Sequence, residues 1–502
     1  MIENIIIGKH TLESLTSGMY SDPFVVFREY IQNCVDSIDQ AINEGILNSD
    51  ASDINICLSP SDRTIKIRDN GKGLSVEEAE KALISIGNSK KSSESSRGFR
   101  GIGRLAALSY CKRLTFTTST CGEAKGTKIT IDAEKLAELL STNNSMDATI
   151  VDVLESVYHV NHFQEKEFSH YFIVLLEGVD ESSSLNSYDD VLDYLTQNVP
   201  VPYDPDTFVW GKEIVGRLQK EGYQLNSYNI SLTYGSSSIR VYKSYKDKFV
   251  VDKGKNIVDS IKDIEIIRIL NANGTLSAIG WIGATHYLGS IYDKSIKGIR
   301  LRKGNILVGD YQTMNVAFKD ARFNGWSVGE IFAIDTSLIP NARRDNYEKN
   351  AAYFNLLEQL TDVAARITKD IRVASLNRNA DLSKALEQSG KIKKVAEAAI
   401  DSGISSFQKG AIKQKLVSAQ EALTNIKTEE SSDTYYQTIA FEELDMLIGK
   451  LKGATTYKAL NTIDKLTNME KKILEKVFNV IMSLNVDNAE NIIEAILVSF
   501  IS

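Results

Sequence analysis

The placement of proline constrains the fold of this chain more than any other feature of its sequence. Only six prolines occur in 502 residues, and none follows Pro340. Because an interior proline costs a helix about 3 kcal/mol, a proline-free segment rich in Ala, Leu, Glu and Lys is free to be helical throughout. Segments 392–400 and 441–448 also show the 3.6-residue apolar period of amphipathic helices. The sequence therefore predicts a mainly helical C-terminal region over residues 346–502.

Half of the prolines, Pro200, Pro202 and Pro205, mark the clearest break in the chain. Three prolines in six positions favour an extended connector. Short segments on both sides of it alternate apolar and polar residues, which is typical of half-buried strands. These segments are 53–58, 64–68 and 128–132 before the break, and 230–234, 238–242 and 299–302 after it. We expect an α+β fold with α/β domains over 1–205 and 206–345, followed by the helical region.

The amino-acid composition limits the cellular compartments and the binding partners that we expect for this chain. The formal net charge of -8 and the pI near 5.5 give no overall attraction to nucleic acid. Cys34, Cys57, Cys111 and Cys121 form no C-x-x-C pair, which indicates reduced thiols in the cytoplasm. The first residues do not resemble a signal peptide, and no segment reaches the ~18 apolar residues of a membrane span. We therefore expect a cytoplasmic protein without membrane contact.

A carboxylate, an amide and a second carboxylate follow one side of a predicted helix over 28–37. Glu29 and Asn33 are four residues apart, so their side chains are neighbours. Glu29 can activate a water molecule, and the carbonyl oxygen of Asn33 can bind a Mg²⁺ ion that bridges the phosphates of ATP. Asp36, one turn further on, is better suited to supporting the helix or hydrogen bonds on the adenine side. The exposed polar face of an amphipathic helix explains the same pattern equally well.

The sequence Asp-Asn-Gly-Lys-Gly over 69–73 follows one of the predicted strands. Asp69 can accept a hydrogen bond from the exocyclic amine of adenine. Gly71 and Gly73 would let the backbone approach the ring, because neither carries a Cβ atom. A simple tight turn is the alternative interpretation of an Asn-Gly pair.

A glycine-rich turn over 98–103 precedes a helix-like segment over 104–108. Glycines before a helix start expose backbone N–H groups to phosphate oxygens, although an ordinary glycine loop is an equal alternative. The lysines of the upstream segment 86–91 can meet phosphate or solvate a mobile lid near 87–104. The candidate nucleotide-binding residues of this part are Asn88, Ser89, Lys90, Gly98, Arg100, Gly101, Ile102 and Gly103.

These elements, together with Gly126-Thr127, resemble in order and spacing the Bergerat ATP-binding fold of the GHKL superfamily. That superfamily includes gyrase, the ninety-kilodalton heat-shock chaperones, histidine kinases and MutL, and the resemblance covers about residues 6–132. It implies an N-terminal α/β sandwich in which a lid closes over ATP. It also implies that Asp69 reads adenine, that Asn33 holds Mg²⁺, and that Thr127 lies near the adenine through a water molecule.

A second resemblance separates the branches of this superfamily. Histidine kinases lack a glutamate at the position of Glu29, so a kinase is disfavoured. Segments 298–304, 329–335 and 338–345 resemble the middle, or transducer, domain of the ninety-kilodalton chaperones, where an Asn-x-x-Arg-acidic turn supplies an arginine to the γ-phosphate. On this resemblance Arg344 is the preferred catalytic arginine, with Arg343 second, and the alternative is that both only cap or solvate a helix start. Residues 133–199 and the helical tail do not align with these chaperones.

These features together predict an ATPase with ATP and Mg²⁺ as ligands, closest to the ninety-kilodalton chaperone branch. ATP would drive lid closure, docking of the first two domains and clamping of a homodimer through the helical region. The client protein cannot be read from the residues.

Two other functions fit the same sequence. The first is an ATP-gated clamp on DNA, as in MutL or the microrchidia proteins, in repair or defence. It is supported by the basic stretches 243–255 and 294–303, which are also explained as solvated faces. The second is an ATP-switched scaffold that recruits an effector.

Overall fold

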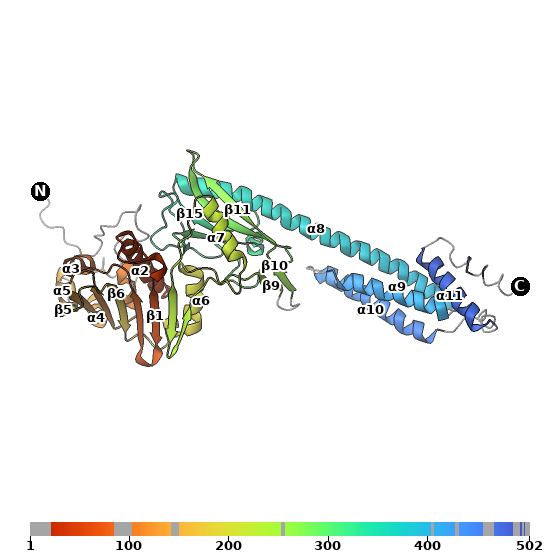
Figure 1. Ribbon diagram of the computed structural model, residues 1–502, viewed down its shortest axis with the longest axis horizontal. Coiled ribbons are helices and arrows are strands. Elements are labelled where there is room, and N and C mark those ends of the chain that lie inside the picture. Colours follow the sequence, from red (N-terminus) through yellow and green to blue (C-terminus); the bar gives the residue numbers. More distant parts are fainter. Residues whose placement is uncertain are drawn as a thin grey trace. The chain divides into compact units, whose positions relative to one another are not determined.

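The computed structural model describes residues 22–84, 103–141, 150–252, 257–402, 406–426, 431–454 and 466–484, with Ile492, Ile493 and Ile496. The chain divides into two compact units, Met1–Lys369 and Asp370–Ser502 (Figure 1). The first unit contains two β-sheets with helices, and the second is helical. The predicted α+β fold class with a helical C-terminal region is thus confirmed.

The first sheet has eight strands in the order β5-β4-β3-β6-β2-β1-β7-β8. Neighbouring strands are antiparallel except for β1 and β7, which pair in parallel. Two of the strands, β7 and β8, lie beyond residue 205, so the chain after the proline-rich connector returns to complete this sheet. The strands are β1 (Ile54–Ser59), β2 (Thr64–Asp69), β3 (Arg113–Ser119), β4 (Lys125–Asp132), β5 (Tyr158–Gln164), β6 (Tyr171–Glu177), β7 (Ile230–Tyr234) and β8 (Ser237–Arg240).

Helices cover one face of this sheet, and the longest of them is α2 (Val25–Asn43). Its buried side chains recur every three or four residues, as Phe27, Ile31, Cys34 and Ile38 show, and they pack against the inward-facing residues of the strands. Because this side of α2 packs against the sheet, the opposite side of the helix, which carries the polar residues, faces away from the sheet. The other helices of this part are α3 (Val76–Ile84), α4 (Ala133–Ser141), α5 (Ile150–Val157), α6 (Tyr188–Asn198) and the 3₁₀ helix η3 (Gly103–Ser109).

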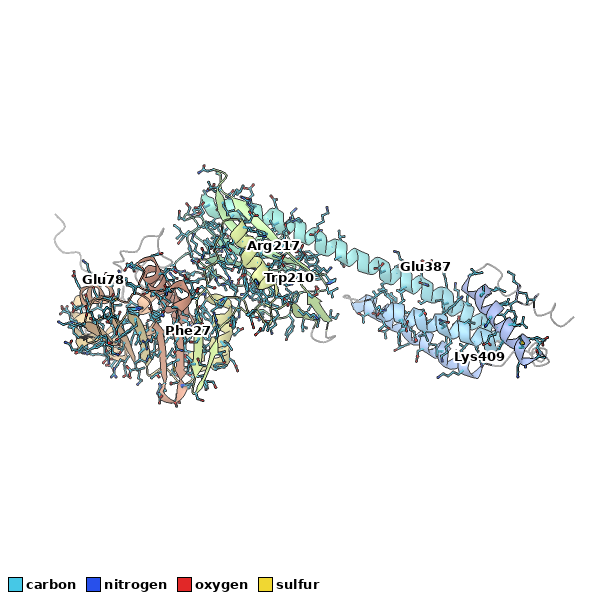
Figure 2. All side chains as sticks on the ribbon, in the orientation of Figure 1. Phe27, Glu78, Trp210, Arg217, Glu387 and Lys409 are labelled. Carbon is cyan, nitrogen blue, oxygen red and sulfur yellow. The ribbon has the colours of Figure 1, made fainter. Side chains whose placement is uncertain are left out.

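The second sheet has five strands in the order β11-β12-β15-β13-β14. Helix α7 (Trp210–Lys220) packs on it through Ile214 and Leu218. Figure 2 labels Trp210 and Arg217 of this helix, and Arg217 pairs with Asp263 of β11 at 3.2 Å. Because α7 precedes β7 and β8, the chain visits the second sheet, returns to the first and then completes the second. The strands are β11 (Asp263–Leu270), β12 (Leu276–Ala284), β13 (Gly298–Lys303), β14 (Ile306–Val308) and β15 (Val328–Ala333), and β9 (Lys248–Asp252) and β10 (Ile257–Ser260) form a separate pair.

The helical region begins with α8 (Ala351–Ser402), which runs from the first unit into the second. It is followed by α9 (Ser406–Thr424), α10 (Ser431–Gly453) and α11 (Asn468–Ser483). In the second unit, leucines and alanines of α8, α9 and α10 form one apolar core. Among the described residues, no helix combines the length and the apolar character that crossing a membrane requires.

Candidate nucleotide site

The polar side of α2 carries the predicted catalytic and magnesium-binding side chains. Glu29, Asn33 and Asp36 are all half-buried and lie on the side of α2 that faces away from the sheet. Val25, on the same side of the helix, packs against Ala106 of η3. The predicted stripe is therefore present, and it faces the segment that follows the glycine-rich turn rather than open solvent.

Glu29 lies between two arginines. Its Oε1 atom is 3.5 Å from Nε of Arg344 and 3.5 Å from Nε of Arg28. The three side chains are only 10–13% exposed, so this ion cluster is largely shielded from water. The structure thus brings together Glu29 and Arg344, which are more than 300 residues apart in the sequence.

The loop after β15 presents Arg344 in a specific backbone conformation. Arg344 has φ +56°, in the left-handed region, and its carbonyl oxygen accepts a hydrogen bond from the backbone N–H of Gly309 at 2.8 Å. The Arg343 side chain is exposed, and its carbonyl oxygen accepts from Nη2 of Arg28 at 3.0 Å. Of the two candidate arginines, Arg344 therefore has the side chain at Glu29, and Arg343 contributes only its backbone.

Two neighbours of this cluster were not predicted from the sequence. Arg28 directly precedes Glu29, which could have drawn attention to it. Tyr194 of α6 stacks on Phe24, with ring centroids 5.2 Å apart. Burial raises the pKa of Tyr194, whereas the charge of Arg28 lowers this pKa and the charge of Glu29 raises it. No local sequence signal marks Tyr194, because it lies within residues 133–199, which do not align with the chaperones that the motifs resemble.

Asp69 at the end of β2 is buried and offers a free acceptor atom. Its side chain is 1% exposed, and Oδ1 accepts a hydrogen bond from the backbone N–H of Gly71 at 2.8 Å. Within the described residues Oδ2 has no hydrogen-bond partner. Burial raises the pKa of Asp69 to about 7, against the lowering effect of the Gly71 N–H and the Cys34 thiol. An amine that donates to Oδ2 would complete this group, as the sequence predicts for adenine.

The glycines after Asp69 are required for a different reason than the predicted approach of the backbone to the ring. A Cβ atom on Gly71 would lie 2.4 Å from Oγ of Ser37, on α2. Gly73 has φ +70°, and its Cβ atom would lie 1.9 Å from the carbonyl oxygen of Ser119, on β3. The two glycines therefore let the loop pack against the protein itself.

The strand order does not bring Thr127 to Asp69. Strands β6 and β3 lie between β2 and β4, so the two residues are three strand spacings, about 14 Å, apart. On the β6 side of β2, the residue directly opposite Asp69 is Phe172. The Oγ1 atom of Thr127 instead lies 3.3 Å from Nδ1 of His162. The predicted contact of Thr127 with adenine is not supported, because motif order along the chain does not give strand order in the sheet.

The glycine-rich turn and the lid lie almost wholly outside the described residues. Of that part of the candidate site, only Gly103 is described, and it opens η3. The segment predicted as helix-like over 104–108 is this 3₁₀ helix. The candidates outside the described residues are Asn88, Ser89, Lys90, Gly98, Arg100, Gly101 and Ile102.

A buried charge cluster supports the loop that carries Arg344. Glu330 on β15 pairs with Nζ of Lys243 at 2.8 Å and with Arg302 on β13, and all three side chains are at most 1% exposed. Tyr203 from the proline-rich connector donates to Glu330 at 2.5 Å. Despite burial, the charges of Arg302 and Lys243 hold the pKa of Glu330 down to about 2. Tyr347, three residues after Arg344, donates to the carbonyl oxygen of Arg302 at 3.1 Å.

This cluster weakens the case for nucleic acid. The basic stretches 243–255 and 294–303 are the sequence features that favoured a DNA clamp. Three of their cations, Lys243, Arg300 and Arg302, are at most 2% exposed. Buried cations cannot neutralise phosphates, and two of these three neutralise Glu330 instead.

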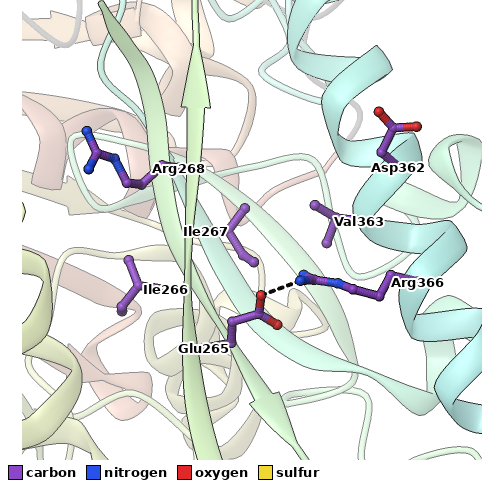
Figure 3. A pocket seen from close by; sticks show the side chains of 7 residues that line it. All are labelled: Glu265, Ile266, Ile267, Arg268, Asp362, Val363 and Arg366. Atoms are coloured by element: carbon purple, nitrogen blue, oxygen red, sulfur yellow. Dashed lines mark ion pairs between the residues drawn. The ribbon is translucent and has the colours of Figure 1, made fainter.

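Glu330→Gln is expected to destabilise the first unit by about 3–5 kcal/mol, because it leaves two buried cations without a counter-charge. Glu265→Gln is the matched control on the same sheet. Glu265 of β11 pairs with Arg366 of α8 at 2.6 Å beside an open pocket, and both side chains are about half exposed (Figure 3). Loss of that pair should cost about 0–1 kcal/mol. Urea unfolding measures both, and equal losses would contradict this account of Glu330.

Nucleotide affinity is expected to fall as the pH falls through 7. A protonated Asp69 no longer offers two acceptor oxygens to an amine, and burial raises the pKa of Asp69 to about 7. If the amine holds the bound carboxylate ionised, the affinity for ADP at pH 6 should be about tenfold lower than at pH 8. Calorimetric titrations measure this. Asp69→Asn, titrated in parallel, corrects for protonation of the nucleotide, and an identical pH profile for both proteins would exclude the carboxyl as the cause.

Over part of its length, this chain is similar in sequence to known proteins. Residues 24–163 match the family described as "Histidine kinase-, DNA gyrase B-, and HSP90-like ATPase". "Chaperone protein HtpG" of Halalkalibacterium halodurans is 27% identical over 255 residues, which are 43% of this chain and 39% of that protein. The protein of the same name from Paramagnetospirillum magneticum is 32% identical over 146 residues, 26% of this chain and 23% of that protein. The chain thus spans less than half the length of these relatives.

Proposed function

We propose that this chain, whose residues 24–163 match the GHKL ATPases and which is similar to chaperones of the Hsp90-like branch, binds and hydrolyses ATP as a chaperone-like ATPase. The observation that carries the proposal is the pairing of Glu29 with Arg344, which joins a potential base and a potential phosphate-binding cation within a largely buried cluster. The unpartnered oxygen of Asp69 supports a ligand with an amine.

Each of these residues would have a separate role in the hydrolysis of ATP. Glu29 would take the proton of the attacking water, and Arg344 would stabilise the charge that develops on the γ-phosphate. Asp69 would accept from the exocyclic amine of adenine. Asn33 is half-buried one turn from Glu29, and its carbonyl oxygen suits the hard Mg²⁺ ion, which neutralises phosphate charge when bound.

The finer mechanism rests on the family resemblance. ATP would close a lid near residues 87–104 over the site, and Asp36 and the turn around Gly103 would line it. The predicted domains would serve ATP binding, transduction and dimerisation in a cytoplasmic protein, and the ATP-binding domain would also include β7 and β8, which lie beyond the predicted boundary at residue 205. Because Arg344 already lies at Glu29, docking of the first two domains would not need ATP to bring these residues together.

The proposal is tested by measuring ATP binding and phosphate release by the purified chain with Mg²⁺. The parent is expected to bind and hydrolyse ATP, and Asp69→Asn to bind it far more weakly. A parent that binds but never hydrolyses ATP would favour an ATP-switched scaffold. Addition of DNA tests the clamp, whose signature is salt-dependent binding stimulated by ATP.

The homodimer is supported by an apolar stripe that runs along α11 and ends at Leu484, directly after the helix. Its side chains recur every three or four residues and are 38–76% exposed among the described residues, while Leu474 and Phe478 on another side of the helix are buried. A second copy of the chain would cover such a stripe with the same stripe of its own. The stripe consists of Met469, Ile473, Val477, Val480 and Leu484.

The double substitution Ile473→Glu and Val480→Glu is expected to convert a dimer into a monomer of 55.7 kDa. Charged side chains would have to be buried at the proposed contact, which is unfavourable. Light scattering with and without a nonhydrolysable ATP analogue measures the mass. Glu475→Lys, an exposed charge off the stripe, should leave the dimer intact. A parent that is monomeric under both conditions would rule the dimer out.

A further inference from the structure

Gln32 on α2 is a buried polar side chain that none of the roles above uses. It is 1% exposed, and neither its Oε1 nor its Nε2 atom has a hydrogen-bond partner among the described residues. A buried amide left unpaired costs about 1–3 kcal/mol. Because native folds rarely keep such groups, an unpaired one calls for a specific explanation, such as a ligand or a catalytic role.

Its position on the helix places Gln32 at the proposed catalytic centre. It lies three residues after Glu29 and four after Arg28, so it is a neighbour of both on the helix surface. It also lies seven residues after Val25, which packs against Ala106 of η3, and seven residues return to nearly the same side of a helix. The amide therefore lies on the side of α2 that faces η3.

A second unpaired atom lies beside it. Nε of Arg28 is buried and has no hydrogen-bond partner among the described residues, although it lies within ion-pair distance of Glu29. Gln32 and Arg28 together thus contribute three buried side-chain atoms without a hydrogen-bond partner among the described residues. These atoms flank Glu29 within about one helical turn. A single polar ligand bound at Glu29 could therefore form hydrogen bonds with all of them.

We propose that Gln32 is a positioning residue that orients the water molecule activated by Glu29. This inference rests on the proposed ATPase function. Oε1 accepts a hydrogen bond from the water, and Nε2–H donates to an oxygen of the γ-phosphate, since a glutamine amide offers both kinds of group. The water oxygen then bonds to the γ-phosphorus while Glu29 takes a water proton. The bond from the γ-phosphorus to the bridging oxygen breaks, and its electron pair leaves with ADP.

Gln32→Leu separates this role from a structural one. Leucine is close in size and removes both unpaired atoms, so the melting temperature should stay the same or rise. The value of kcat is expected to fall about 10²-fold, because the water is no longer aligned, while KM changes by less than a factor of about 3. The matched control is Gln40→Leu on the same helix, an exposed glutamine that donates to Glu44 at 3.0 Å, and it should keep the parent kcat.

A second variant, Gln32→Glu, keeps the acceptor but removes the donor, and it is also expected to lower kcat. A Gln32→Leu protein that hydrolyses ATP at the parent rate overturns the proposal. One that melts at a lower temperature or loses ATP binding also overturns it, in favour of a structural glutamine. These outcomes presuppose a parent that hydrolyses ATP. A parent without hydrolysis instead removes the proposed function, and the two failures are thus distinguished by the parent alone.

Discussion

Glu29→Gln is expected to lower kcat for ATP hydrolysis by a factor of about 10²–10⁴ and to leave ATP binding within a few-fold of the parent. Glutamine keeps the size of the side chain and still offers an amide oxygen to the neighbouring Arg28 and Arg344. It cannot take a proton from water, so only the chemical step should suffer. Single-turnover phosphate release measures that step, and calorimetry with a nonhydrolysable ATP analogue measures binding separately.

Glu44→Gln provides the control for this result. Glu44 directly follows α2 and pairs with Lys72 at 2.8 Å, with its side chain 40% exposed. Its loss removes the same charge from the protein at a surface position, where an ion pair contributes about 0–1 kcal/mol. If Glu29→Gln hydrolysed ATP as fast as Glu44→Gln, another group would have to be the base. Loss of binding together with hydrolysis would show that Glu29 serves mainly to hold the nucleotide.

Local sequence patterns predicted the individual strands and helices well, but they predicted the solvent exposure of the side chains less well. The alternation over 299–302 corresponds to strand β13, as predicted. It also suggested that Arg300 and Arg302 face solvent, but both are 1% exposed. Their partner Glu330 lies on β15, on a different segment of the chain. An alternation of apolar and polar residues shows that one side of a strand is polar. It cannot show that a buried carboxylate from another segment faces that polar side.

Pairing between distant strands was the main feature that the sequence could not provide. Ile54 of β1 is in register with Ile230 of β7, and no local signal joins two segments that far apart. The proline-rich connector was recognised, but the return of the chain to the first sheet was not. The same limit explains Thr127, which follows the expected motif order yet lies three strands from Asp69. Phe172 takes the place beside Asp69 without any motif of its own.

The contact between Glu29 and Arg344 was predicted from a family resemblance and not from a local sequence pattern. The spacing of Glu29 and Asn33 follows from helix geometry, so that part of the site could be predicted from the sequence. Nothing local relates residue 344 to α2, and only the likeness of segment 338–345 to a known middle domain suggested it. The structure adds the reason: Arg28 binds the carbonyl oxygen of Arg343, which holds the loop at the helix.

Arg344→Ala is expected to lower kcat by a factor of about 10³–10⁵, the effect typical of an arginine that stabilises a transferring phosphoryl group. The affinity for ADP, which lacks the γ-phosphate, should change little. Arg344→Gly sharpens the test, because Arg344 has φ +56° and glycine adopts this conformation without the cost of about 1–2 kcal/mol that other residues carry. The glycine variant should therefore be at least as slow as the alanine variant but more stable than it in urea unfolding.

Arg343→Ala is the matched neighbour, because its side chain is exposed and only its backbone contacts Arg28. It should hydrolyse ATP at the parent rate. Loss of hydrolysis in Arg343→Ala with parent rates in Arg344→Ala would reverse the assignment. The double variant Glu29→Gln with Arg344→Ala should be little slower than the slower single variant, since residues that act on one transition state give non-additive effects. Additive losses would mean that the 3.5 Å contact between Arg344 and Glu29 has no catalytic meaning.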